Sequence, residues 1–359
     1  MRMKRTGVAD LPLHPGRAPR WLFERMVKLG RAISEILILE YGRDEFLRRL
    51  SDPFWFQAFS CVLGFDWHSS GTTTVTCGAL KEAINLSEYG ISVAGGKGSV
   101  SRKTPDEIKK FGEILSLSDS RIDSLIYSSR MAAKVDNSAI QDGYNLYHHV
   151  FIFSEDGKWV VIQQGMNEKN RYARRYHWLS EDVKSFVNEP HSGIAGYERK
   201  ERVLNMVARE SEECRKACVD IVKENPKKLV NWFRRISYQK TLDGEEMLSM
   251  PMSINWSLMK KIYDFQPTNY EELLSIRGVG PKTVRSLALI ADLIYGSKPS
   301  WRDPIKFTFT VGGKDGVPYP VNRRLMDEAI SLLEEAIEKA RMGREEKLKA
   351  LKRLRALIK

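Results

Sequence analysis

The stretch that decides the fold reads YNLYHHVFIFSEDGKWVVIQQ and spans residues 144–164. Two runs rich in β-branched and aromatic residues flank Asp156-Gly157, a dipeptide typical of the tight turn in a β-hairpin. Before and after this stretch, apolar residues recur mostly at helical spacing. The sequence therefore predicts an α+β fold, with an N-terminal α+β domain over residues 1–195 and a mostly helical C-terminal domain over residues 196–359.

Composition favours an acidic partner for this chain. The 359 residues carry a formal net charge of +12, and an excess of this size favours a polyanion such as nucleic acid through phosphate neutralisation. No apolar run approaches the ~20 residues of a membrane helix, and the basic start of the chain lacks the apolar core of a secretion signal. We expect a cytoplasmic protein that contacts no membrane and keeps its four cysteines as reduced thiols.

Residues 165–195, polar, aromatic and basic, are predicted to form a loop and a short helix. Within them the run from Arg171 to Trp178 mixes positive charge with aromatic rings, a combination that suits single-stranded or flipped nucleotides. We therefore predict that Arg174 and Arg175 contact DNA. An amphipathic loop that covers the core explains the run equally well.

Acids, amides and histidines cluster around the start of the predicted β-hairpin. His148 and His149 face opposite sides of a strand, so at most one of them joins a given site. Asp142, His149 and a glutamine at residue 163 or 164 are candidates to meet across the hairpin, where they could bind a divalent metal ion for phosphodiester hydrolysis. The alternative is that these polar residues are structural.

Two further segments combine glycine, hydroxyl side chains and lysine. They are HSSGTTT at residues 68–74 and GGKGS at residues 95–99, and this composition suits phosphate binding. Neither has the G-x4-G-K-[ST] frame of a P-loop. Solvated loops of no special function are the alternative interpretation.

The sharpest motif is TNYEELLSIRGVGPKTVRSLALIADLIYG at residues 268–296. It predicts a helix over residues 270–276, a turn over 277–282 and a second helix over 283–295. The pattern resembles the helix-hairpin-helix of DNA-binding proteins, in which a hydrophobic residue stands between two glycines. Gly278 and Gly280 would let main-chain amides approach a phosphate closely at the start of the second helix. The side chains of Lys282 and Thr283 would add a positive charge and a hydroxyl group to the same contact.

The resemblance extends to helix-hairpin-helix DNA glycosylases. Lys282 occupies the position of their nucleophilic lysine, and Asp303 stands where these enzymes carry an aspartate that stabilises developing positive charge. Those enzymes need a lysine with a depressed pKa. The chain departs from the pattern after Asp303, where Pro304 and a β-like stretch replace the expected helix. Lys282 could equally serve as a simple phosphate ligand.

A wider resemblance covers essentially the whole chain. The segments TGVADLPLHPG, DPFWFQAF, GFDWHSSGTTT, KVDNSAIQDGYNLYHH, QQGMN, ARRYHW, GVGPKT and GGKDG resemble an uncharacterised prokaryotic family, number 763 among the domains of unknown function. That resemblance implies no established activity. The sequence thus predicts a DNA-binding protein of DNA repair or processing, acting as a nuclease or a glycosylase/lyase. A non-enzymatic architectural DNA-binding protein and an RNA-processing factor stay open as alternatives.

Overall fold

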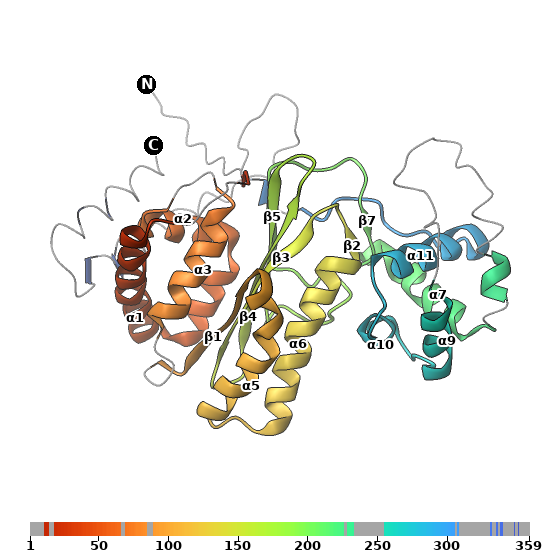
Figure 1. Cartoon of the computed structure of the whole chain (residues 1–359), viewed down its shortest axis with the longest axis horizontal. Helices are drawn as coiled ribbons and strands as arrows, with labels where there is room; N and C mark the ends of the chain where they lie inside the picture. Colours follow the sequence, from red (N-terminus) through yellow and green to blue (C-terminus); the bar gives the residue numbers. More distant parts are fainter. Residues whose placement is uncertain are drawn as a thin grey trace.

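The computed structural model describes residues 11–13, 18–65, 69–84, 89–225, 228–232, 255–305 and 307–308, together with isolated positions between 331 and 351. A central sheet separates helices at the two ends of the molecule (Figure 1). The described chain thus combines a largely antiparallel sheet with helices at both ends of the molecule, which confirms the predicted α+β class.

The central sheet has six strands in the order β1-β3-β4-β5-β6-β8. Neighbouring strands are antiparallel from β1 to β6, and β8 joins β6 in parallel. A separate two-stranded sheet pairs β2 (Ile140–Gln141) with β7 (Leu204–Asn205). The strands of the central sheet are β1 (Ile91–Lys97), β3 (Asn145–Ser154), β4 (Trp159–Asn167), β5 (Tyr172–Leu179), β6 (Gly193–Gly196) and β8 (Phe307–Thr308).

The predicted β-hairpin is observed as β3 and β4, joined at Asp156-Gly157. Gly157 has a φ of 80°, a conformation that glycine adopts without steric cost. The expectation of loop and short helix over residues 165–195 is wrong for β5, which lies inside the sheet between β4 and β6. Its charged side chains are buried, so the polarity of the run concealed a central strand.

One face of the sheet is covered by α1 (Arg20–Ser51), α2 (Pro53–Leu63) and α3 (Gly71–Ala83). The Asp52 side chain starts α2 by accepting hydrogen bonds from the Phe54 and Trp55 amides, as an N-cap does. Strand residues such as Val150 and Ile152 pack with these helices in one buried cluster. Residues of even number in this part of β3 therefore face α1, α2 and α3.

The other face carries η1 (Gly98–Lys103), α5 (Thr104–Ile114) and α6 (Asp119–Ser138). Beyond β6 the chain continues through η2 (Arg209–Ser211), α7 (Glu212–Lys223), α9 (Trp256–Phe265), α10 (Tyr270–Ser275) and α11 (Pro281–Tyr295). One buried cluster joins Phe151 and Trp178 of the sheet with Leu287 of α11. The predicted boundary after residue 195 falls within β6, and the parts on either side of it share this core.

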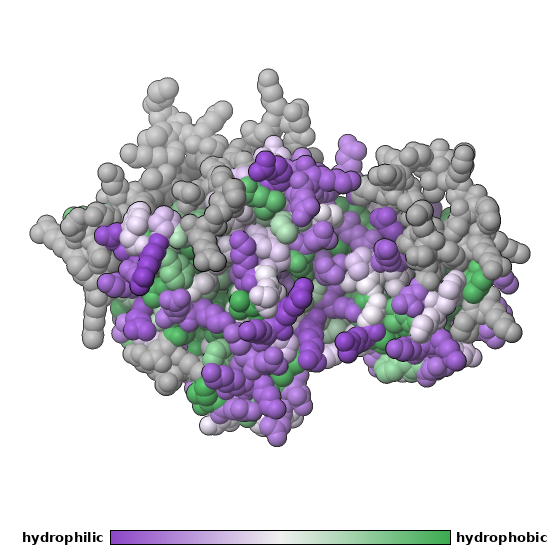
Figure 2. All heavy atoms as spheres, viewed as in Figure 1, coloured by the Kyte–Doolittle hydropathy of each residue, from purple (hydrophilic) through white to green (hydrophobic). Residues whose placement is uncertain are grey.

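Hydrophilic side chains gather on the surface over α5 and α6 (Figure 2). Among the described residues no helix is long and apolar enough to cross a membrane. All four cysteines are buried and free, as expected for reduced thiols.

Candidate nucleic-acid interface

The two helices predicted within residues 268–296, and the turn between them, are present as α10, a tight turn and α11. Asn269 begins α10, because its side chain accepts a hydrogen bond from the Glu272 amide while the Glu272 carboxylate accepts one from the Thr268 amide. This reciprocal arrangement satisfies two amides at the helix start. Pro281 occupies the first turn of α11, where its missing N–H costs nothing.

The turn between α10 and α11 buries one residue and exposes another. Val279 is 2% exposed and belongs to the core, so it fixes the turn against the protein. Gly278 is exposed and has a φ of 103°, which a residue with a side chain adopts only under strain. Gly280 has a φ of −139°, an extended conformation open to any residue. Gly278 is thus needed for the shape of the turn, whereas a role of Gly280 must lie in close approach.

The main-chain N–H groups at the N-terminus of α11 are not capped by a side chain of the N-cap residue. No side chain caps this 15-residue helix, and its first turn holds no acidic residue. Lys282 is exposed and Thr283 is half-buried at this end. The first amides of a helix lack internal partners and carry the positive end of its dipole, so this end of α11 suits an anion.

Three side chains hold the turn in place from the side of α6 and β2. Lys134 of α6 donates to the Ile276 carbonyl at 3.2 Å, and Gln141 of β2 donates to the Pro281 carbonyl at 2.8 Å. Arg285 of α11 in turn donates from Nε to the Gln141 side-chain oxygen at 3.0 Å. Carbonyl groups of the turn therefore bind protein, and so does the Val279 amide, which donates to the Ile276 carbonyl at 3.1 Å. The amides left for a ligand are those at the start of α11.

Lys134 and Arg285 bring positive charge that no carboxylate of the described residues compensates by an ion pair. Both are half-buried, and burial lowers the pKa of each. Within the described ranges neither forms an ion pair with a carboxylate, and Arg277 is exposed on the same turn. The sequence prediction missed Lys134 and Arg285. For Arg285 a signal existed, since it follows Lys282 by three residues and shares its helix face.

Two of the predicted catalytic acids meet at Arg174 instead of at Lys282. The Arg174 guanidinium contacts Asp142 at 3.0 Å and Asp303 at 2.8 Å, with all three side chains fully buried. Burial raises the pKa of Asp142, and the Arg174 charge opposes that rise. Asp303 also accepts hydrogen bonds from the Lys200 and Ile305 amides. Through these hydrogen bonds the Asp303 carboxylate links segments that are distant in sequence.

His149 lies in a different buried network. Its ring nitrogens contact the Ser129 hydroxyl and the Gln163 side-chain oxygen, each at 2.8 Å. The expected meeting of His149 with a glutamine of the hairpin is therefore observed, but Asp142 is not part of it. Asp136 takes that place, since its carboxylate accepts a hydrogen bond from Gln163 at 2.6 Å. In the described part of the chain, no group of three or more His, Cys, Asp or Glu residues could hold a metal ion.

The structure corrects the prediction that Arg174 and Arg175 contact DNA. Both side chains are 0% exposed, because they belong to the central strand β5 and point to its two faces. Arg175 binds neutral acceptors among α2 and α3, including the Gln57 side chain at 2.9 Å. Neither arginine can reach a nucleic acid on the surface of this structure.

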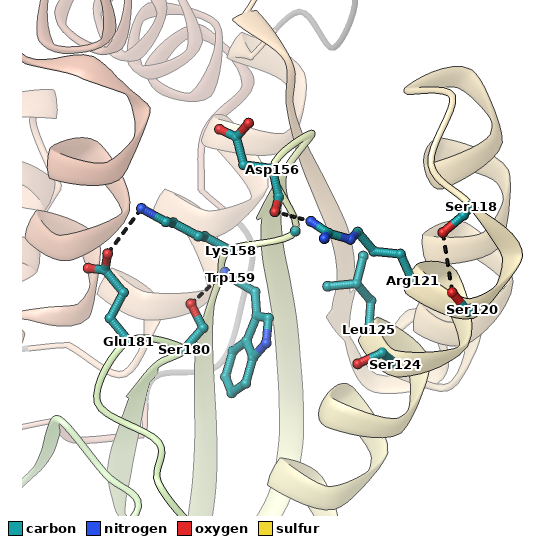
Figure 3. Close-up of a pocket in the computed structure, with 11 residues that line it drawn as sticks. Ser118, Ser120, Arg121, Ser124, Leu125, Asp156, Lys158, Trp159, Ser180 and Glu181 are labelled. Carbon is teal, nitrogen blue, oxygen red and sulfur yellow. Dashed lines mark hydrogen bonds and ion pairs between the residues drawn. The ribbon is translucent and has the colours of Figure 1, made fainter.

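A hollow of about 600 Å³ lies between the start of α6 and the turn from β3 to β4 (Figure 3). Its cations already have partners. Lys158 forms ion pairs with Asp44 and Glu181, and Arg121 donates to the Asp156 carbonyl. The Lys158 charge is thus neutralised within the protein, in contrast to the Lys134 and Arg285 charges around the turn before α11, whereas Arg121 donates to a neutral carbonyl.

Comparison with protein-family models identifies one match of wide extent. The model described as "Protein of unknown function (DUF763)" matches residues 7–321. No curated protein and no solved structure matches the chain.

Proposed function

The chain belongs to the DUF763 family, and because that description names no activity, we propose a function from the geometry. The turn between α10 and α11 binds the phosphate backbone of DNA, in the setting of DNA repair or processing. The observation that carries the proposal is the uncapped start of α11 with its exposed turn and no acidic residue. Contacts of this kind position a protein on a nucleic acid without reading its bases.

Charge around the turn supports the same proposal. Lys282 and Arg277 are exposed, while Lys134 and Arg285 are half-buried with no carboxylate partner in the described ranges. A half-buried cation without a counter-ion stabilises an anion that arrives beside it. Phosphate groups would supply the missing negative charge.

Lys282 fits the role of phosphate ligand better than that of a nucleophile. A glycosylase-like reaction would need Asp303 to face the reacting centre. The residue is 4% exposed, and its carboxylate accepts two hydrogen bonds from the Arg174 guanidinium. Lys282 is exposed to solvent, where the desolvation that activates a lysine is missing. We therefore propose backbone binding and assign no reaction to this turn.

The experiment is a fluorescence-anisotropy titration of labelled duplex DNA at several salt concentrations. For Lys282→Ala we expect weaker binding on every DNA sequence, with the slope of log K against log salt reduced by about one. Lys184→Ala is the matched control, because Lys184 is likewise exposed but lies far from the turn in sequence. Equal salt slopes for both variants would refute the proposed contact. A single-stranded or A-form RNA that competes better than duplex DNA would favour the RNA alternative.

A further inference from the structure

Arg175 is a buried positive charge whose hydrogen-bonded partners in the described chain are all neutral, although the charge of nearby Asp52 also acts on it. Its guanidinium donates to the Gln57 side chain, the Pro53 carbonyl and the His177 ring at 2.8–3.1 Å. It also lies 3.4 Å from the Thr73 hydroxyl at the start of α3. All four acceptors are neutral, and burial lowers the pKa of Arg175 to about 9. Such a charge is costly to keep in a protein interior unless an anion approaches it.

The two glycine-rich segments singled out in the sequence come together next to this charge. Gln164 of β4 accepts a hydrogen bond from the Thr73 hydroxyl and donates to the Ser70 carbonyl at 2.8 Å. It also donates to the Tyr147 hydroxyl. The Lys97 ammonium, from the GGKGS segment, lies 5.8 Å from the centre of the Tyr147 ring. The start of α3 and the end of β1 therefore lie next to each other, in contact with Tyr147 and Gln164.

His148 contributes two polar atoms that have no hydrogen-bond partner among the described residues. The residue is 1% exposed, and neither ring nitrogen is bonded to any group in that part of the chain. It pairs with Lys97 on one side and with Gln164 on the other, and directly opposed residues of a sheet point to the same face. Burial, followed by the nearby His149 and Lys97 charges, lowers the pKa of His148 to about 3. A neutral imidazole with one free donor and one free acceptor therefore stands beside Gln164 and Lys97.

Solvent reaches the edge of this cluster. Lys97 is exposed, and Tyr147 and Gly71 are half-buried. Lys97 forms no ion pair within the described ranges, so its charge is free to meet a ligand. The Ser70 side chain does not cap the 13-residue helix α3, although the Ser69 hydroxyl accepts a hydrogen bond from the Gly71 amide at 3.0 Å. The helix directs the positive end of its dipole to the same place.

We propose that the cluster of Lys97, Tyr147, His148, Gln164 and the start of α3 binds the phosphoryl group of a small molecule. Lys97 and the helix dipole attract the anion from solvent, and the charge of Arg175 stabilises it from the interior of the protein. The imidazole of His148 donates its N–H to a phosphoryl oxygen. This site is separate from the turn before α11 and does not depend on DNA binding there.

The experiment uses the full chain, with inorganic phosphate and with adenosine mono- and triphosphate as separate ligands. Histidine rings labelled with nitrogen-15 are followed by NMR during titration to about 10 mM, which nearly fills a site of millimolar affinity. We expect the His148 signals to shift. The His149 signals are the internal control, because both nitrogens of that ring are bonded on the opposite face. Saturation of the shift at a lower concentration of nucleotide than of phosphate identifies the nucleotide as the preferred source.

Two variants separate this site from weak surface binding. Lys97→Glu should weaken phosphate binding about tenfold or more, whereas the same change at the exposed Lys184 should leave it as in the parent protein. His148→Leu should abolish the rise in Tm on addition of phosphate while the protein stays folded. The proposal is overturned if the His148 signals do not move with any of the three ligands. It is equally overturned if Lys97→Glu and Lys184→Glu bind phosphate alike.

Discussion

Arg174 and Arg175 are neighbours in sequence and fully buried on opposite faces of β5, yet the protein treats their charges differently. Arg174 is held by two carboxylates, Asp142 and Asp303. Arg175 has neutral acceptors alone among its bonded partners in the described chain. Two carboxylates on one guanidinium tie distant segments together and leave no net positive charge for a ligand. Within the described chain the Arg175 guanidinium is hydrogen-bonded to no carboxylate, so its charge, opposed by nearby Asp52, is less fully neutralised than that of Arg174.

The difference gives a rule for finding anion sites in this molecule. Near the turn before α11, Lys134 and Arg285 are half-buried cations that form no ion pair with a carboxylate in the described ranges. Arg175, fully buried beside α3, is likewise bonded to neutral groups. In the hollow near the start of α6, by contrast, Lys158 is paired with Asp44 and Glu181. Buried charge with neutral bonded partners is therefore found at the two places proposed to bind phosphate. It is also found at Arg215, which donates to the Met206 and Ala208 carbonyls and to the Asn188 side chain, so this feature identifies candidates and does not define a site by itself.

The largest expected effect comes from removing the compensated arginine. Arg174→Met leaves Asp142 and Asp303 buried without a counter-ion, which should lower the free energy of unfolding by about 3–5 kcal/mol. Urea denaturation followed by circular dichroism measures the change. If this variant is too unstable to purify, Asp303→Asn should still show a clear loss of stability. An unfolding midpoint equal to that of Arg175→Met would remove the distinction between the two arginines.

Removing the uncompensated arginine should cost less. Arg175→Met loses hydrogen bonds to neutral groups but also relieves a buried charge, so the free energy of unfolding should fall by about 1–2 kcal/mol. The rise in Tm caused by phosphate should disappear with it. Differential scanning fluorimetry with and without phosphate measures both effects. A variant that keeps the full phosphate-induced rise would show that the Arg175 charge plays no part in the site.

The lowered pKa of His148 predicts that the free energy of unfolding depends on pH. Its pKa is lowered from 6.5 to about 3, so between these values the unfolded chain binds a proton that the folded chain excludes. Stability therefore falls as pH falls from about 6.5, by up to about 1.4 kcal/mol per pH unit for one such group. His148→Leu should make the decline shallower, with His149 and His177 accounting for the remainder. Unfolding free energies in urea between pH 7 and pH 5 test this, and an unchanged slope would contradict it.

The last comparison concerns the two glycines of the turn, and one of them, Gly280, gives the smallest expected effect on stability. Gly278→Ala places a side chain at a φ of 103°, 3.1 Å from the Leu258 side chain, and should cost about 1–2 kcal/mol. Gly280→Ala meets its nearest atom at 3.9 Å in an extended conformation, so it should leave the unfolding midpoint nearly unchanged. Thermal denaturation of both variants measures the difference. Equal losses would mean that the turn is shaped differently from this description.

Local patterns were enough to predict some elements and not others. The β3–β4 hairpin and the helices around the turn follow from alternation, from Asp156-Gly157 and from the spacing of apolar residues. Strand β5 was missed because the charge of Arg174 is balanced by Asp303, which lies 129 residues away. Asp142, Asp303 and His149 looked catalytic for the same reason, since their buried partners come from distant segments. His148 became a candidate only when the structure showed that its nitrogens have no partner.

The most direct test of backbone binding is the affinity of Gly280→Ala for duplex DNA, measured by anisotropy beside the parent protein at the same salt concentration. If a phosphate lies against the main chain before α11, the added methyl group should weaken binding about tenfold while the unfolding midpoint stays the same. Unchanged affinity in a folded Gly280→Ala variant would contradict close contact between this turn and the DNA backbone.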